Sequence, residues 1–207
     1  MGTWEMIAAE RAALVDKLAE LPEDRWEQAS LCSGWTVRDV AGHITASAYQ
    51  TQLSFFVGLV GAGFSFDRFV DKGAHKQTQG RSTKEVVDAL RARIDARNHP
   101  PGPSLAMLGE VVIHGEDIFR AIGMPGVDHP TEHVVAVADF YKRSNLIVGA
   151  KRRIAGLTLR ANDTDWSNGS GPEASGPVLS LVLAMTGRIA ALDELAGDGI
   201  ATLRARC

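Results

Sequence analysis

The stretch LAMLGEVVIHGEDIFRAIG, residues 105–123, decides how the rest of the chain is arranged. Its apolar residues recur three, four or seven positions apart, which is the pattern of an α-helix with one buried face. Glu110 and His114 interrupt that face four positions apart, so their side chains lie one helical turn apart on the same side. A buried carboxylate and imidazole at this spacing can share one cation. A hydrogen-bonded pair in the core, or a half-exposed polar stripe, is the alternative.

The composition is that of an ordinary globular protein. A length of 207 residues suits one domain, or a domain with a small appendage. The net charge of −3 gives no electrostatic reason to expect nucleic acid binding. No apolar run is long enough to cross a membrane, and the charged, amphipathic N-terminus is unlike a signal peptide. We therefore expect a cytoplasmic protein that binds neither nucleic acid nor a membrane.

Helical periodicity and capping signals predict further helices around the central one. Thr36 with Asp39 resembles a capping box, and Ser82 with Glu85 forms another. Short and moderate connections between the helices favour an antiparallel bundle. The other predicted helices cover about residues 4–20, 36–59, 83–98 and 131–150.

Two parts of this bundle leave alternatives open. His43 falls on the apolar face of the second helix, where a lone histidine is more often a hydrogen-bonded core residue than a ligand. Residues 51–69 are rich in glycine and phenylalanine, and they either fill the core or form the wall of a pocket. Residues 71–81 are predicted to form an exposed loop.

The pattern changes near residue 154. Residues 157–160 alternate like a short strand, a helix is predicted over 178–186, and residues 197–207 are predicted to form a closing strand. We therefore expect a helical bundle over residues 1–153 and a small α/β module over 154–207. The module is too short for a robust core of its own, so it should pack on the bundle, with Trp166 as an anchor.

Four segments together carry a family resemblance: GWTVRDVAGH at 34–43, EVVIHGEDIFRAIG at 110–123, TDWSNGSGPEASGP at 164–177 and GDGIATLRA at 197–205. The chain resembles the mycothiol-dependent maleylpyruvate isomerase family, within the DinB-like four-helix-bundle superfamily. The resemblance covers nearly the whole chain. It implies a mainly α fold, a DinB-like four-helix bundle with a small C-terminal α/β module. The C-terminal module is shorter than that of the isomerase itself.

The resemblance also implies a divalent metal, usually zinc, held by His43, Glu110 and His114. Nickel is an alternative, since imidazole ligands suit both metals. Two imidazoles and one carboxylate leave one position of a tetrahedral zinc open, as in catalytic zinc sites. An open metal can bind a thiol and lower its pKa until the thiolate forms at neutral pH.

The expected function is that of a mycothiol-dependent transferase or isomerase, which presents a metal-bound thiolate to a small electrophile. Its partners would be a small-molecule thiol and that electrophile, and a homodimer is left open. The alternative is a non-catalytic bundle that binds a metal or ligand and acts through a partner. Cys32 and Cys207 are the only cysteines, and neither has a clear claim to be the nucleophile. We expect Cys32 to be a packed turn residue.

Several further residues are candidates for supporting roles. Asp39 or Asp117 could orient a ligand imidazole, although Asp39 is better explained as a helix cap. Arg120 could bind an anionic cofactor or substrate, or pair with Glu116 four positions earlier. A last pair, His129 and His133, has the spacing of metal ligands, but we expect both to be exposed.

Overall fold

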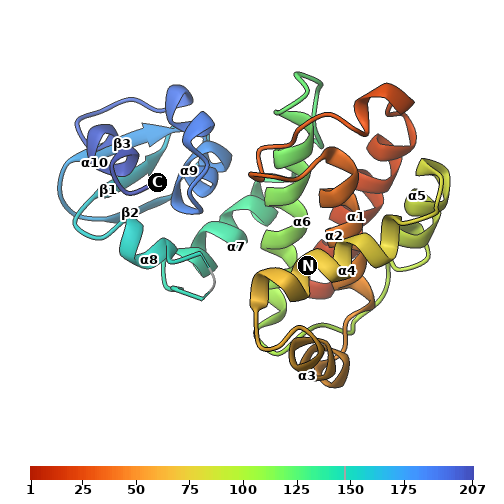
Figure 1. Ribbon diagram of the computed structural model, residues 1–207. Helices are drawn as coiled ribbons and strands as arrows, with labels where there is room; N and C mark the ends of the chain where they lie inside the picture. Colours follow the sequence, from red (N-terminus) through yellow and green to blue (C-terminus); the bar gives the residue numbers. More distant parts are fainter. Residues whose placement is uncertain (147) are drawn as a thin grey trace. The chain divides into compact units, whose positions relative to one another are not determined.

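The computed structural model describes residues 1–146 and 148–207. The chain forms two compact units, Met1–Asp128 and His129–Cys207 (Figure 1). Each unit has its own arrangement of helices, and each is described by itself below.

Four helices of the first unit form a bundle. Helix α1 packs on α5 and α6, and α2 packs on the same two helices, so the four close a ring (Figure 1). Their buried faces meet in one core that includes Leu14, Ile44, Leu90 and Phe119. The expected mainly α fold with a four-helix bundle is thereby confirmed. The four helices are α1 (Thr3–Ala19), α2 (Val37–Tyr49), α5 (Thr83–Arg91) and α6 (Ser104–Phe119).

The start of α2 follows the capping signal in the sequence. The backbone N–H of Asp39 donates to Oγ1 of Thr36 at 3.2 Å, and the backbone N–H of Thr36 donates to Oδ2 of Asp39 at 2.9 Å. Two N–H groups that the helix itself leaves unpaired are satisfied in this way. The predicted capping box is confirmed, and it fixes where α2 begins relative to its buried face.

Helix α2 ends at Tyr49, so the expectation that it continues to about residue 59 is wrong. Thr51 accepts a hydrogen bond from the N–H of Ser54 and starts a separate helix, α3 (Gln52–Gly61). Ser65 starts another, α4 (Phe66–Thr78), where an exposed loop was expected. Each new start is a side-chain cap of the kind that opens a helix. Helix α4 packs along α2.

A glycine permits this close packing. A Cβ at Gly42 of α2 would lie 2.5 Å from Cγ2 of Thr78 and 2.8 Å from the backbone oxygen of Ala74, both on α4. Any larger residue would push the two helices apart. The close contact holds α4 against the helix that carries His43.

The second unit combines helices with a small sheet. Strand β1 (Thr158–Ala161) is central, antiparallel to β2 (Ser167–Gly169) and parallel to β3 (Glu173–Gly176). The predicted strand at 157–160 and the helix at 178–186 are therefore present, the latter as α9 (Val178–Met185). The expected closing strand is wrong, because the last element is the helix α10 (Ile200–Arg204). Ahead of that helix, Ala196 forms an isolated bridge with Ser175, and the N–H of Gly199 donates to the backbone oxygen of Glu173 on β3 at 2.7 Å.

Helix α7 (Thr131–Tyr141) belongs to this second unit, where it packs on α9; the short α8 (Ala150–Arg153) follows it. Trp166 is buried, and its Nε1 donates to Oδ1 of Asp139 on α7 at 3.1 Å. The compact units thus divide earlier in the chain than residue 154. The domain limits 1–153 and 154–207 stay a prediction.

Among the described residues, no individual helix combines the length and the apolar character needed to cross a membrane. Taken as a pair, α3 and α4 meet the length and composition test, but they are bent by 110° where they join.

Candidate metal centre

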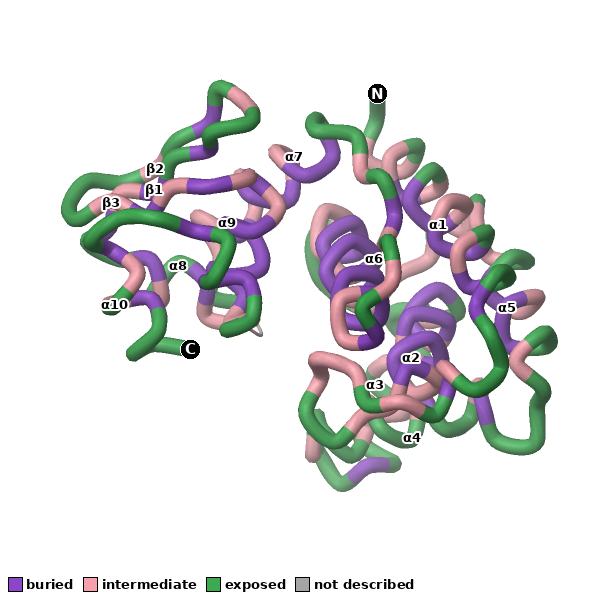
Figure 2. The backbone as a smooth tube through the Cα atoms, turned by 90° about the horizontal axis from the view of Figure 1, so that it is seen from above, coloured by how far each residue is buried: buried purple, intermediate pink, exposed green. Residues whose placement is uncertain are grey.

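The three expected metal ligands lie together where α2 packs on α6. Nε2 of His43 is 3.4 Å from Oε1 of Glu110, and the rings of His43 and His114 meet edge to face with their centroids 5.0 Å apart. Glu110 and His114 reach this point because they lie one turn apart on α6. The side chains are 16–19% exposed, so the group is largely buried yet still open to solvent. Figure 2 shows that α2 and α6 consist mostly of buried residues.

Glu110 has an unsatisfied oxygen. Its Oε1 is buried and has no hydrogen-bond partner among the described residues, while Ser47 of α2 donates a side-chain hydrogen bond to the carboxyl group. Burial raises the pKa of Glu110, and the nearby His114, the Ser47 bond and the Arg11 guanidinium oppose that rise. A buried acceptor without a donor is costly unless a cation or proton satisfies it. The site therefore fits a bound cation.

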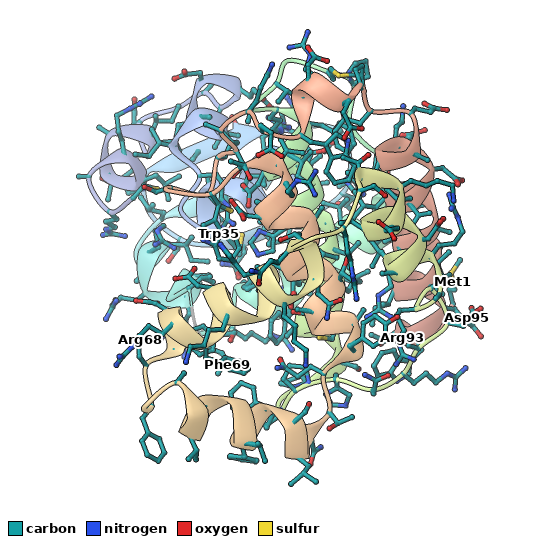
Figure 3. All side chains as sticks on the ribbon, turned by 45° about the vertical axis from the view of Figure 1, so that its right-hand side comes forward. Met1, Trp35, Arg68, Phe69, Arg93 and Asp95 are labelled. Atoms are coloured by element: carbon teal, nitrogen blue, oxygen red, sulfur yellow. The ribbon has the colours of Figure 1, made fainter. Side chains whose placement is uncertain are left out.

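His43 is held in its neutral form. Burial lowers its pKa to about 3, and the neighbouring His114 contributes in the same direction. The Trp35 ring also packs on His43, tilted by 59° with the centroids 5.2 Å apart (Trp35 is labelled in Figure 3). A neutral imidazole keeps the lone pair that a metal requires. His43 is thus prepared for ligation at neutral pH without losing a proton.

Asp117 orients the second imidazole. It is fully buried, and its Oδ2 lies 2.9 Å from Nδ1 of His114. A hydrogen bond donated by Nδ1 leaves the Nε2 lone pair available for a metal, which is the usual arrangement around ligand histidines. Of the two aspartates considered from the sequence, Asp117 makes this contact, whereas Asp39 caps α2.

Cys32 adds a second group of potential ligands. Its Sγ donates to Oδ2 of Asp117 at 3.1 Å and lies 3.6 Å from Nδ1 of His114. Ligand atoms of Cys32, His114 and Asp117 all lie within 4.8 Å of one another, so they could hold a metal on the Nδ1 side of the ring. The two groups share His114. A metal on Nδ1 would replace the contact that orients the ring for the first group.

The sequence offered no spacing that would reveal Cys32, because its partners are far away along the chain. The contact is tertiary: the N–H of Leu31 donates to the backbone oxygen of Asp117 at 3.0 Å and ties the loop to α6. Cys32 does pack against the core as expected, but its thiol also faces the centre.

The remaining candidates lie elsewhere. Nε of Arg120 donates to Glu116, the intrahelical pairing weighed as an alternative, and its role toward a cofactor stays a prediction. His133 is fully buried within the second unit, so its expected exposure is wrong. Arg11 is buried as well, and its Nη1 donates to backbone oxygens of residues 93–96 after α5.

A comparison with protein families matches residues 7–119 to the mycothiol maleylpyruvate isomerase N-terminal domain. The chain belongs to this family. The matched segment contains all of the residues described above at the centre, from Cys32 to Asp117. No curated protein sequence matches the chain significantly.

Two solved structures are similar over almost the whole chain. A crystal structure of the mycothiol-dependent maleylpyruvate isomerase has a TM-score of 0.63 and 15% identity, covering 95% of this chain and 91% of that one. A crystal structure of a histidine-to-alanine mutant of the isomerase has a TM-score of 0.59 and 13% sequence identity, with the same coverage of the two chains. At these identities the likeness shows the fold, which includes both the bundle and the C-terminal unit.

Proposed function

We propose that the protein is a metal-dependent, mycothiol-dependent transferase or isomerase that acts on a small electrophile. The observation that carries this proposal is the meeting of His43, Glu110 and His114 at one point, within the segment matched to the family. The orphaned Oε1 of Glu110 supports a cation there.

Each residue has a defined part in this proposal. His43 and His114 would supply neutral imidazole nitrogens, and Glu110 would supply the one negative charge. Asp117 would keep the His114 ring in place through Nδ1. A bound divalent cation, with zinc expected and nickel the alternative, would lower the pKa of an incoming thiol toward neutrality. Three protein ligands would leave room for that thiol.

The thiol would come from outside the chain, because neither cysteine suits the role. Cys32 donates its thiol hydrogen to Oδ2 of Asp117, so this thiol is already engaged with the group that orients His114. Burial raises the pKa of the Cys207 thiol. A cysteine with a raised pKa is a weak nucleophile at neutral pH. Mycothiol is the thiol that the family indicates.

Calorimetry of mycothiol binding to the metal-loaded protein tests this proposal. Because the bound form is the thiolate, binding near neutral pH should release a proton, seen as a heat that depends on the ionisation enthalpy of the buffer. The Cys32→Ala, Cys207→Ala double variant should behave like the wild type. Loss of thiol-dependent turnover in that variant with the metal retained would assign the chemistry to an internal cysteine. Absence of both mycothiol binding and proton release in the wild type would reject the proposal.

A second candidate function is a metal-bearing bundle that acts through a partner without turnover. One observation favours it: α3 presents a row of exposed apolar side chains, including Leu53 at 74% and Phe56 at 57% exposure. Such a surface is typical of an interaction site. The two candidates are separated by assaying the metal-loaded protein with mycothiol and a panel of electrophiles, since only the first predicts turnover.

A further inference from the structure

Helix α3 carries a continuous row of exposed apolar side chains, here named the α3 stripe: Leu53, Phe56, Val57, Val60 and Phe64. Their spacing of three and four places the helical members on one face, and Phe64 follows just beyond the end of the helix. They are 57–75% exposed. No residue of α3 is buried.

The opposite side of α3 is fixed to α4. The rings of Phe55 and Phe69 meet edge to face with centroids 5.1 Å apart, and a Cβ at Gly58 would lie 2.6 Å from the Phe69 ring. Lys72 of α4 donates to the backbone oxygen of Gly61 at 3.1 Å. Figure 3 shows Phe69 pointing from α4 toward α3. These contacts fix the opposite face of α3 to α4, so the α3 stripe faces solvent.

Phe64 is the one described non-glycine residue with a positive φ, at 59°. This left-handed backbone is unfavourable for a bulky residue. Its N–H donates to the oxygen of Leu59 at 2.9 Å, which closes the end of α3 and projects the ring outward. Phe64 is 75% exposed, so burial within the chain does not compensate for the strain.

Two copies of the stripe would together bury about 1,000 Å², which is the lower limit of a specific interface. A large aromatic side chain offers roughly 150–250 Å², so five large apolar side chains at these exposures present on the order of 500 Å². A monomer rarely exposes a larger contiguous patch than this, and a stable interface buries about 800 Å² from each partner. Phe66, 41% exposed, adds apolar area close in sequence to the stripe, and its ring lies 6.2 Å from that of Phe69.

The absence of charged residues on α3 indicates what kind of partner covers the α3 stripe. Residues 51–66 contain no charged side chain. A helix that lies on a membrane surface presents a polar face rich in Lys and Arg. Helix α3 has no such residue, and the adjacent Lys72 of α4 is bound to the backbone oxygen of Gly61. A charge-free stripe meets a second copy of itself without like-charge repulsion. We propose that the α3 stripe pairs with the same stripe of a second chain about a two-fold axis. This pairing does not depend on the proposed function.

Sedimentation equilibrium of the full-length protein tests the pairing, because dimerisation makes the mass concentration-dependent across about 1–200 µM. The wild type should be dimeric, and Val57→Glu should weaken the dimer at least about 100-fold, since the charge would be buried without a partner. Ile189→Glu is the matched control, because Ile189 is 49% exposed and lies outside α3; it should leave the dimer intact.

Three results would overturn the pairing: a wild-type monomer at the highest concentration, an unchanged dimer in Val57→Glu, or binding of wild-type monomer to phosphatidylcholine–phosphatidylserine vesicles through the stripe. Circular dichroism checks that Val57→Glu is folded. If it is not, Val57→Ser replaces it, and slower hydrogen exchange of residues 52–61 at high wild-type concentration gives a readout without any substitution.

Discussion

Nε2 of His43 lies 3.4 Å from Oε1 of Glu110, on two different helices. This separation is long for a hydrogen bond, and burial acts on both groups, lowering the pKa of His43 to about 3 and raising the pKa of Glu110. In the protein without metal, burial therefore favours the uncharged form of each. A divalent cation would reverse this for the carboxyl group and leave the imidazole as it is.

Replacing His43 should make the unfolding free energy of the metal-free protein fall less steeply as the pH is lowered below about 6.5. Between the ordinary pKa of 6.5 and about 3, the unfolded chain binds a proton at His43 that the folded chain does not. Unfolding free energy should therefore fall by up to about 1.4 kcal/mol for each pH unit of acidification in that window. The raised pKa of Glu110 has the opposite effect on the unfolding free energy. Above pH 4.5 the folded chain binds a proton at Glu110 that the unfolded chain does not, so this contribution to stability is lost as the pH rises.

The measurement is urea unfolding across this pH range in the presence of a chelator, for the wild type and His43→Gln. The difference between the two profiles isolates the His43 contribution, because Glu110 is present in both. Parallel profiles would show that His43 is not buried in its neutral form.

Glu110→Gln should weaken metal binding far more than it weakens the fold. The amide keeps the shape but removes the only negative charge among the three proposed ligands, while it relieves the cost of burying a carboxylate. Metal affinity by competition with a chromophoric chelator should drop at least about tenfold. Metal-free unfolding free energies that differ by more than about 3 kcal/mol would instead make Glu110 a structural residue.

Single substitutions also separate the two groups of potential ligands. His114→Ala should abolish stoichiometric metal in either case, because both groups contain His114. If His43, Glu110 and His114 hold the metal, His43→Gln should lose it and Cys32→Ser should keep it. Elemental analysis of the purified variants gives the answer, with the exposed His75→Gln as control. Metal lost from Cys32→Ser but kept in His43→Gln would assign the site to Cys32, His114 and Asp117.

Gly42→Ala should destabilise the protein by about 1–3 kcal/mol, because the new methyl group would overlap the backbone of α4. Gly73→Ala is the matched control on α4 itself. Its Cβ would meet Cβ of Ala46 at 3.5 Å, an ordinary contact, so helix propensity should make it neutral or stabilising by about 0.5–1 kcal/mol. Thermal unfolding of both variants measures the difference. Equal melting temperatures would show that α2 and α4 separate easily.

Helices with a clear apolar face could be predicted from the sequence, and α1, α2 and α6 begin close to where their apolar patterns begin. The predicted capping boxes are present at the starts of α2 and α5. The break after Tyr49 was missed because residues 37–59 are apolar enough to continue as one helix, while a local Thr51–Ser54 cap ends it. The strand expected at the C-terminus was wrong for a similar reason: alternation over a few residues does not distinguish a strand from the short helix α10.

The candidate centre was partly predictable. The spacing of Glu110 and His114 places both on one face of α6, and the family resemblance added His43. Cys32 and Arg11 could not be found in this way, because their environment is set by long-range packing. A charged residue at the edge of an amphipathic pattern is normally expected to be exposed. Arg11 is nevertheless fully buried, and its guanidinium donates hydrogen bonds to backbone oxygens.

His43 lies on α2 and Glu110 on α6, with α3, α4 and α5 between them in the chain. A cation held by both would act as a cross-link that closes this long loop. The unfolded chain, in which the two residues are far apart, could not bind it with comparable affinity, so the binding energy would add to the stability of the native state. Loading would accordingly follow folding of the bundle, and removal of the metal would speed the opening of α2 from α6.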